Sequence, residues 1–530
     1  MSRSQLLALA LALVAGCSPR PETPDPDAPA GRVQPAAAYG AVNALDPNGP
    51  PIPDPPVAAS RDGVLELTLT AAPAVVTVAG RTFRSNVYNG SYIPPVLRVW
   101  RGDDVRITFI NAVDSADILI DEPQPSNLHY HGMAISPLEP ADNIYISIPL
   151  RAAAPGDTVM TEDGGHAAGL AKSSPVYEYR WSVPANHPQG PHWYHPHRHH
   201  FAEPQVLSGM SGMLLVEGMV QEQFPELAGA RRRILVLKDI ILPGDADTLP
   251  HTKTINGILG GTIRMAPGAV EIWEIGNVGA DAYFDLTVDG HRVWVLTRDG
   301  NILERPEPAL NIFLPPASRA TVAIQAGAAG LYGIRSLEVD TGPMGDPNPH
   351  VLLATLVVEG TPVDHRAMAD RLARPAANPA SIHPRVDEIR SAPIARRRRI
   401  VYSETPDGET FFLNGRQFDP DRVDAEATVG DVEEWTLVNE TGERHTFHIH
   451  QLDFLVISIN GNDEDATGLR DNIDLPYRDP VTGEPGVVTV IIPFTDPTIV
   501  GRFPFHCHIL EHEDGGMMAT MEVRPRPAEP

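Results

Sequence analysis

Two cysteines occur in this 530-residue chain, and one of them, Cys507, is surrounded by side chains that bind metals. His506 and His508 flank it, and His512 and Met517 follow closely. A thiolate, imidazoles and a weak axial thioether are the ligands of a blue-copper electron-transfer site. Neighbouring side chains on a strand point to opposite faces, so Cys507 would face one copper while the flanking histidines face something else. One short segment is therefore expected to connect two metal centres.

Half of the 20 histidines fall into four clusters. The clusters are His129 and His131; His195 and His197; His445, His448 and His450; and His506, His508 and His512. Two histidines at positions i and i+2 of a strand project from the same face, as two ligands of one metal cluster must. A single pair is a weak signal because paired surface histidines are common on strands. Four clusters together with Cys507 indicate a site for several metal ions.

The elements that must position these histidines follow a pattern that recurs three times. An Asn-Gly turn leads to an alternating strand, a second turn and another alternating strand, beginning at Asn89-Gly90, Asn256-Gly257 and Asn414-Gly415. Short strands with frequent turns and little helical periodicity predict β-sandwiches. Three copies of the pattern predict three sandwiches in an all-β chain.

Composition and charge bound the class of protein. The chain is 42% hydrophobic and has no long apolar run beyond its N-terminus, which predicts a globular protein of several domains with large cores. The formal net charge of -27 argues against nucleic acid as a partner. The arginine runs 231–233 and 396–399 each precede a β-rich stretch, so we interpret them as the beginnings of solvated strands.

The N-terminus has the features of an export signal. Arg3, an apolar stretch at 6–14 and the small residues before Cys17 are typical of a secretory signal peptide. The same residues resemble a bacterial lipoprotein box, in which residues 1–16 are removed and Cys17 is lipidated; ordinary signal cleavage is the alternative. We expect a periplasmic or cell-surface lipoprotein that is anchored to a membrane. Residues 17–60, rich in Pro, Ala and Asp, are predicted to form a tether.

The histidine segments resemble the four copper motifs of the multicopper oxidases, a family that includes laccases and copper-efflux oxidases. They are His129-Tyr130-His131-Gly132, Trp193-Tyr194-His195-Pro196-His197, His445-Thr446-Phe447-His448-Ile449-His450 and the Cys507 segment. All four occur in the order of the family, and the resemblance covers about residues 63–525. It implies three consecutive cupredoxin-like Greek-key β-sandwich domains. We place these at 61–219, 220–363 and 396–526, with a linker over 364–395 that has room for a short helix at 365–372.

The resemblance also implies four copper ions per chain and a role for each ligand. The type 1 copper would take His445, Cys507 and His512 with Met517 axial; type 2 copper His129 and His448; one type 3 copper His131, His195 and His508; and the other His197, His450 and His506. A reducing substrate would be oxidised at type 1 copper, and dioxygen would be reduced to water at the trinuclear cluster between domains 1 and 3. Domain 2 has no clustered histidines and is expected to be structural or substrate-shaping.

Several other polar residues are candidates for supporting roles. Reduction of dioxygen to water consumes protons, which carboxylates near the cluster would carry. Glu513 and Asp142 resemble two acidic positions of the family with this role, although either residue could be a structural hydrogen-bonding carboxylate. Asp471 resembles a family position on the route to type 1 copper, with a plain loop carboxylate as the alternative. Three further histidines are expected to lie outside the ligand set, namely His192, His199 and His200.

The reductant is less well defined by the sequence. No methionine-rich insertion lies between Phe454 and Phe503, which favours a phenol or an aromatic amine over Cu(I). Oxidation of Cu(I) or Fe(II) at a carboxylate-lined site is the alternative. Residues 462–465 supply carboxylates in this region, but a solvated acidic loop is the better interpretation of them. A copper-binding or electron-transfer cupredoxin without turnover, or a nitrite-reductase-like protein, is a remoter alternative, against which the complete histidine set argues.

Overall fold

The computed structural model describes residues 44–113, 124–150, 170–246, 249–382 and 384–527. The predicted signal peptide, Cys17 and the first part of the predicted tether lie outside these ranges. The strands of the described residues form six β-sheets and the helices are short, which confirms the predicted all-β fold. In the described part of the chain, no helix is both long enough and apolar enough to cross a membrane.

The first sandwich pairs a five-stranded sheet, in the order β1-β4-β9-β8-β6, with a four-stranded sheet, β3-β2-β5-β7. Their strands are β1 Val57–Ala59, β2 Val64–Val78, β3 Arg81–Tyr88, β4 Val96–Val99, β5 Asp104–Asn111, β6 His129–His131, β7 Val176–Ser182, β8 Pro191–His195 and β9 Gly212–Val216. Side chains from both sheets meet in one core, where the rings of Tyr88 and Tyr194 lie 5.8 Å apart. β6 and β8 thereby hold their histidines on a packed scaffold.

The second sandwich pairs a six-stranded sheet, β11-β10-β13-β18-β15-β16, with a five-stranded sheet, β12-β20-β19-β14-β17. The strands are β10 Arg231–Ile240, β11 Thr252–Ile255, β12 Gly261–Met265, β13 Val270–Asn277, β14 Phe284–Val288, β15 Val293–Arg298, β16 Asn301–Ala309, β17 Asn311–Leu314, β18 Arg319–Gln325, β19 Gly330–Leu337 and β20 Val351–Val358. Trp273 of β13 and Leu286 of β14 belong to its shared core.

The third sandwich pairs the sheets β22-β21-β24-β29-β26-β27 and β23-β31-β30-β25-β28. Its strands are β21 Arg396–Glu404, β22 Phe411–Leu413, β23 Ala425–Thr428, β24 Asp431–Asn439, β25 His445–Ile449, β26 Leu455–Ile459, β27 Asn462–Asp463, β28 Asn472–Leu475, β29 Gly486–Phe494, β30 Gly501–Cys507 and β31 Met518–Arg524. Trp435 of one sheet meets Phe505 of the other at 5.0 Å between ring centroids. The arginine runs begin β10 and β21, as the sequence predicts, but Arg233 is not solvated, because it is buried and paired with Glu271.

The Asn-Gly turns adopt the left-handed backbone conformation that these residues tolerate best. Asn89, Asn256 and Asn414 have φ of 49°, 51° and 52°, and the glycine that follows each of them also has positive φ. Each turn lies between residues paired as an isolated antiparallel bridge, such as Tyr88 with Ser91. The repeat in the sequence therefore corresponds to one tight hairpin turn in each sandwich.

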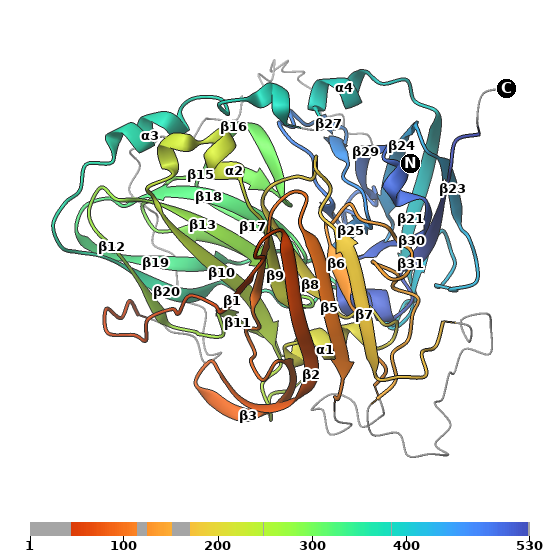
Figure 1. Cartoon of the computed structure of the whole chain (residues 1–530), viewed down its shortest axis with the longest axis horizontal. Coiled ribbons are helices and arrows are strands. Elements are labelled where there is room, and N and C mark those ends of the chain that lie inside the picture. Colours follow the sequence, from red (N-terminus) through yellow and green to blue (C-terminus); the bar gives the residue numbers. More distant parts are fainter. Residues whose placement is uncertain (1–43, 114–123, 151–169, 247–248, 383, 528–530) are drawn as a thin grey trace, which may run out of the picture. The chain divides into compact units, whose positions relative to one another are not determined.

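Short helices connect and brace the sandwiches. They are α1 Ala202–Ser208, α2 Met219–Gln223, η2 Pro225–Leu227, α3 Arg366–Leu372, η3 Pro379–Ser381, α4 Val386–Ser391, η4 Pro497–Ile499 and α5 Leu510–Asp514. α3 forms where a short helix was expected, and its Leu372 packs with Phe224 and Leu227. α4 packs Ile389 against Leu455 of the third sandwich. The predicted linker is therefore docked on both neighbours (Figure 1).

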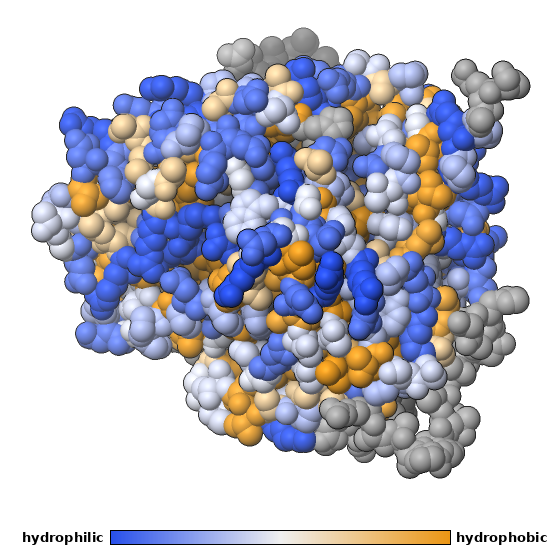
Figure 2. All heavy atoms as spheres, viewed as in Figure 1, coloured by the Kyte–Doolittle hydropathy of each residue, from blue (hydrophilic) through white to orange (hydrophobic). Residues whose placement is uncertain are grey.

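The tether prediction needs correction where the structure describes it. Ile52 is buried in the core of the second sandwich, and Val57–Ala59 forms β1, which pairs in parallel with β4. The buried Ile52 side chain and the pairing of β1 with β4 hold this otherwise Pro-rich segment on the sandwiches. The face drawn in Figure 2 is mainly hydrophilic, with apolar residues scattered in small groups.

Candidate metal centres

Eight buried histidines converge from the first and third sandwiches. They are His129, His131, His195, His197, His448, His450, His506 and His508. Antiparallel pairing places His129 of β6 opposite His195 of β8, and His448 of β25 opposite His506 of β30. Opposite residues in a ladder have side chains about 5 Å apart, so each pairing brings two rings together. The two pairs of strands face one another (Figure 1), and rings from both sandwiches come into contact.

Three Nε2 atoms of this cluster point at a common centre. The Nε2 atoms of His197, His450 and His506 lie 3.0 to 3.2 Å from one another. A neutral imidazole has only one N–H, so three such nitrogens cannot satisfy one another by hydrogen bonds. A second group has His131 Nδ1 at 3.2 Å from His508 Nε2. Both groups have the convergent donors that a metal ion requires.

The remaining inward nitrogens also lack partners. Nε2 of His129, of His195 and of His448 has no hydrogen-bond partner among the described residues. The opposite ring nitrogen of His195 meets the carbonyl of Pro196 at 2.9 Å, and that of His448 meets the carbonyl of Asp471 at 2.7 Å. Donation of Nδ1–H to a carbonyl leaves the Nε2 lone pair facing inward, which is how proteins orient metal-binding histidines.

Burial keeps the cluster histidines neutral. It lowers the pKa of His129 and of His506 to about 3, because a charged imidazolium is poorly solvated in the interior. Neutral imidazole is the form that binds metals. At neutral pH the cluster therefore presents lone pairs rather than positive charge.

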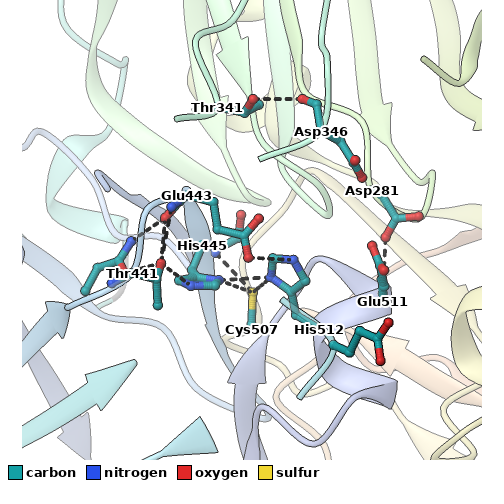
Figure 3. A network of polar contacts seen from close by, with 12 residues as sticks. Asp281, Thr341, Asp346, Thr441, Glu443, His445, Cys507, Glu511 and His512 are labelled. Atoms are coloured by element: carbon teal, nitrogen blue, oxygen red, sulfur yellow. Dashed lines mark hydrogen bonds and ion pairs between the residues drawn. The ribbon is translucent and has the colours of Figure 1, made fainter. Parts of the chain in front are cut away.

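A second set of donors surrounds Cys507 (Figure 3). Its Sγ lies 3.7 Å from His445 Nδ1 and 3.6 Å from His512 Nδ1, and the two nitrogens are 2.9 Å apart. Met517 is fully buried in the same core, and its carbonyl accepts a hydrogen bond from Cys507 N. Burial raises the pKa of the Cys507 thiol, so a thiolate here needs a metal ion beside it. The backbone N–H of Thr446 points at the sulfur.

Glu513 and Asp142, the two predicted proton carriers, both contact cluster histidines. The Glu513 carboxyl lies 3.3 Å from His197 Nδ1 and 3.3 Å from His506 Nδ1, and it is fully buried. Burial, with a smaller effect from Asp514, raises its pKa well above the usual value. Neither of its oxygens has a hydrogen-bond partner within the described chain. It is therefore held less rigidly than Asp142.

Asp142 is held in place by several donors. One oxygen accepts a hydrogen bond from Tyr130 N at 3.0 Å, and the other accepts one from Gln451 Nε2 and lies 3.0 Å from His129 Nδ1. Burial raises the pKa of Asp142, although both donors oppose the rise. These contacts suit a residue that orients His129 better than one that moves a proton.

Comparison with known proteins decides the family. Residues 224–361 and residues 393–527 each match a family model described as multicopper oxidase, and together these segments make up about half of the chain. The chain belongs to the multicopper oxidase family. Members of this family are copper-dependent and use dioxygen and a reducing substrate, so copper is the metal that the two donor sets would take.

Two curated relatives differ in their descriptions. The chain is 25% identical over 455 residues to a multicopper oxidase, mco, of Staphylococcus aureus, covering 82% of this chain and 83% of the relative. It is 24% identical over 497 residues to the cell division protein FtsP of Escherichia coli, covering 90% of this chain and 93% of the relative.

Solved structures of multicopper oxidases share the fold. A multicopper oxidase of Campylobacter jejuni, described as a metallo-oxidase, has a TM-score of 0.70 at 22% identity, covering 92% of this chain and 99% of that one. A laccase-like multicopper oxidase, CueO, of Ochrobactrum sp., described as active towards lignin model compounds, has a TM-score of 0.66 at 22% identity, covering 89% and 100%. The similarity therefore extends over all three sandwiches.

In this multicopper oxidase the predicted place of Asp471 is wrong. Asp471 precedes β28 and lies not beside Cys507 but against the cluster, with Oδ1 at 3.3 Å from His131 Nε2. Burial raises its pKa, and the charge of Arg319 opposes the rise. Arg319 of β18, in the second domain, contacts Asp471, a link to the cluster that the expectation of a structural or substrate-shaping second domain did not include. A single arginine in a Pro-rich turn has no sequence signal for this role.

The acidic loop at 462–465 is a surface feature. Asp463 and Asn462 of β27 are exposed, and Asp465 pairs with Arg305. A pocket opens next to His512, and none of these four residues lines it. The interpretation as a solvated loop is the right one, and carboxylates near the Cys507 site must come from elsewhere.

The histidines predicted to lie outside the ligand set take up different positions. His192 is buried, with its ring 5.0 Å from that of His187. His199 stacks near His200, with 3.8 Å between their ring centroids, and His200 Nδ1 lies 3.1 Å from the carbonyl of Asp514. None of the three belongs to the groups of convergent donors described above.

A pocket between the second and third sandwiches opens beside His512. Three carboxylates lie along it, those of Asp281, Asp346 and Glu443. Glu443 Oε1 is 3.2 Å from His512 Nε2, the ring edge turned away from Cys507 (Figure 3). Burial, followed by the neighbouring Glu404 carboxyl, raises the pKa of Glu443 to about 10. The apolar wall of the pocket comprises Leu249, Pro250, Ala282, Pro347, Pro349, Val351 and Ile509.

The rim of this pocket contains an ion pair that makes stability depend on pH. His251 Nδ1 lies 2.8 Å from Asp239 Oδ2; burial lowers the pKa of His251, but Asp239 outweighs it and raises the pKa to about 9. The pair stabilises the fold fully below the unfolded pKa of about 6.5, by at most about 3 kcal/mol, and the effect disappears as the pH rises through about 9. Thermal unfolding should therefore show His251→Gln less stable than wild type at pH 6 and close to it at pH 10. A difference that does not vary with pH would contradict this.

Proposed function

We propose that this protein oxidises a reducing substrate in one-electron steps beside His512 and couples this to the four-electron reduction of dioxygen to water at the eight-histidine cluster. The observation that carries the proposal is the position of Cys507. Its neighbours in the chain, His506 and His508, belong to the cluster, while its sulfur faces the other donor set. Two centres joined by a few covalent bonds suit the transfer of single electrons from one to the other.

The donor sets fit copper of the expected kinds. A thiolate, two imidazoles and a buried thioether match a type 1 ion held by His445, Cys507, His512 and Met517. Eight neutral imidazoles match a trinuclear cluster, with type 2 copper on His129 and His448 and the two type 3 ions on the remaining histidines: His131, His195 and His508; His197, His450 and His506. Copper bound in these places would supply the one-electron redox changes and the binding of dioxygen.

Residues of the chain would relay the protons that the reaction consumes. Glu513 contacts two cluster histidines, and burial raises the pKa of its carboxyl well above the usual value, which favours the protonated form. A protonated carboxyl within reach of the reacting oxygen can act as a general acid. Asp142, held by Tyr130 and Gln451, keeps His129 oriented. We assign proton delivery to Glu513 and positioning to Asp142.

The pocket supports a second candidate for the reductant. A phenol or an aromatic amine is the expectation from sequence, and the apolar wall would accept its ring. The side-chain oxygens of Asp281, Asp346 and Glu443 would be ligands for a metal cation, and Asp281 Oδ2 is buried with no hydrogen-bond partner among the described residues. Oxidation of Cu(I) or Fe(II) is therefore the alternative.

Oxygen uptake by copper-loaded protein would test the function and the reductant together. The protein assayed begins at Ser18, because the proposed export removes residues 1–16 and lipidates Cys17. Uptake with a diphenol, an aromatic amine and Cu(I), corrected for autoxidation of the metal, ranks the reductants. A copper content of one or two ions per chain with no uptake would favour a protein without turnover.

A charge variant sharpens the choice of reductant. Asp346 is an exposed carboxylate of the pocket, and Asp465 is an equally exposed one elsewhere, so Asp346→Asn and Asp465→Asn form a matched pair. One charge at contact distance in water is worth roughly 1 kcal/mol, so Asp346→Asn should raise the KM for Cu(I) about fivefold. The KM for a diphenol should not change. Equal KM values for Cu(I) in the two variants would remove the case for a cationic reductant.

A further inference from the structure

A buried arginine joins all three sandwiches next to the histidine cluster. Arg319 is the first residue of β18 in the second sandwich, and its side chain is completely inaccessible. Its Nη1 and Nη2 donate to the two carboxylate oxygens of Asp471 in the third sandwich, at 2.7 and 2.6 Å. Its Nε donates to the carbonyl of Pro191 at 3.2 Å, and Pro191 begins β8, the strand that ends at His195. The guanidinium group therefore connects elements that carry cluster histidines.

Asp471 in turn contacts two histidines of the cluster. Its Oδ1 lies 3.3 Å from Nε2 of His131, which belongs to β6 of the first sandwich. Its backbone carbonyl accepts a hydrogen bond from Nδ1 of His448, on β25 of the third sandwich, at 2.7 Å. The two rings stack with their centroids 3.8 Å apart. One residue thus orients a pair of rings that belong to different sandwiches.

His131 is oriented differently from the histidines of the Nε2 triad. Its Nδ1, not its Nε2, faces the neighbouring donor, His508 Nε2 at 3.2 Å. A neutral imidazole has one N–H, and a carboxylate can only accept. If Nε2–H of His131 is donated to Asp471, the lone pair of Nδ1 is directed at the centre. A bidentate guanidinium fixes the plane of the carboxylate and therefore the direction of this hydrogen bond.

We propose that Arg319 is a positioning residue of the oxygen-reducing cluster. Acting through Asp471, it determines which nitrogen of His131 faces the metal, and it keeps His131 and His448 in their relative places. The inference rests on the proposed function, and it assigns to the second domain a part in the cluster in addition to any part in the substrate pocket.

The surrounding backbone is adapted to this ion pair. Gly132, directly after His131, has φ of +80°, and a Cβ at this position would collide with Arg319 Nη2 and Asp471 Oδ2. Asn472 Nδ2 donates to the carbonyl of Pro316 at 2.7 Å and to Ser318 Oγ at 2.9 Å, which ties the two segments together on either side of the pair. Gly132 leaves space for the guanidinium. Asn472 holds the start of β28, and with it Asp471, beside the segment that leads to Arg319.

The test compares two buried ion pairs in the copper-loaded protein from Ser18. Arg319→Met removes the guanidinium at the cluster. Arg233→Met removes another bidentate arginine of the same sheet, paired with Glu271 and in contact with no cluster histidine. Loss of a group that orients a metal ligand typically costs 10- to 100-fold in metal affinity. Arg319→Met should weaken copper binding at the cluster by about that factor and alter the paramagnetic resonance of cluster copper, with the visible absorption of the Cys507 site unchanged.

Rescue separates positioning from simple stability. In the double variant Arg319→Met/Asp471→Asn the side chain that faces His131 no longer carries an unpaired charge, and its amide oxygen can still accept from His131 Nε2–H. Cluster copper and its resonance spectrum should therefore return towards those of wild type. Arg319→Lys keeps the charge but not the two-pronged geometry, so an intermediate loss is expected; this variant takes the place of Arg319→Met if the latter does not fold.

The outcomes distinguish this inference from the function on which it rests. The inference alone would be overturned if wild-type protein holds copper at both centres and Arg319→Met has the same copper content and resonance spectrum as wild type. Equal loss of cluster copper in Arg319→Met and Arg233→Met would also overturn it, because the effect would then be one of stability. Wild-type protein that binds copper only beside Cys507 would overturn both.

Discussion

Replacement of Cys507 by serine should abolish both the intense visible absorption and the oxidation of any reductant. The sulfur would supply the thiolate ligand of this site, and it lies 3.7 and 3.6 Å from the Nδ1 atoms of His445 and His512. A serine hydroxyl remains protonated at neutral pH and is a hard ligand, so it does not replace a thiolate in a blue-copper site. Oxygen uptake should fall to the background rate, while copper at the eight histidines stays bound.

Copper analysis, visible absorption and paramagnetic resonance of the same samples test this expectation. Met521→Leu is a suitable control, because Met521 is fully buried in the same core as Cys507 and contributes only packing there. The control should keep both the colour and the turnover. Normal turnover in Cys507→Ser would show that electrons enter the protein elsewhere. Loss of all copper would instead show that the two donor sets do not form independently.

The convergence of the histidines was predictable from their spacing. The i, i+2 pairs lie on or at the ends of short strands, and alternation places the rings of each pair on one face. Antiparallel registers such as His448 opposite His506 then bring pairs from separate segments together. The assignment of single histidines to single copper ions stays a prediction. The recurring Asn-Gly turns likewise indicated the three sandwiches, because asparagine and glycine favour the backbone conformation that a tight turn requires.

Features that arise where sandwiches dock were not predictable. Arg319 and Asp471 are 152 residues apart and belong to different sandwiches, so no local pattern connects them. The carboxylates beside His512 come from β-strand ends and loops of two sandwiches, which meet only in the folded chain. Ile52 and Val57–Ala59 show the same effect. Ile52 packs into the second sandwich and Val57–Ala59 pairs with β4, although the composition of the segment is typical of a tether.

Glu513→Gln should slow the reaction with dioxygen far more than the reaction with the reductant. The carboxyl lies 3.3 Å from the Nδ1 atoms of His197 and His506, and burial raises its pKa well above the usual value, which favours the protonated form. Glutamine has the same shape but no acidic proton. Loss of a general acid typically costs about 10² to 10⁴ in rate, so reoxidation of the reduced protein by dioxygen should slow by that factor. Anaerobic reduction of the Cys507 chromophore should proceed as in wild type.

Glu511→Gln provides the matched control, since Glu511 lies on the same helix α5 but is exposed. Stopped-flow measurement of the two half-reactions separates proton supply from electron supply. If Glu513 delivers protons, the reoxidation rate of Glu513→Gln should also lose part of the pH dependence seen in wild type and in Glu511→Gln. Equal rates of reoxidation in the two variants would assign Glu513 a structural part beside His197 and His506. A slower reduction by the reductant would instead place its effect on His512, its neighbour in the chain, rather than on the cluster.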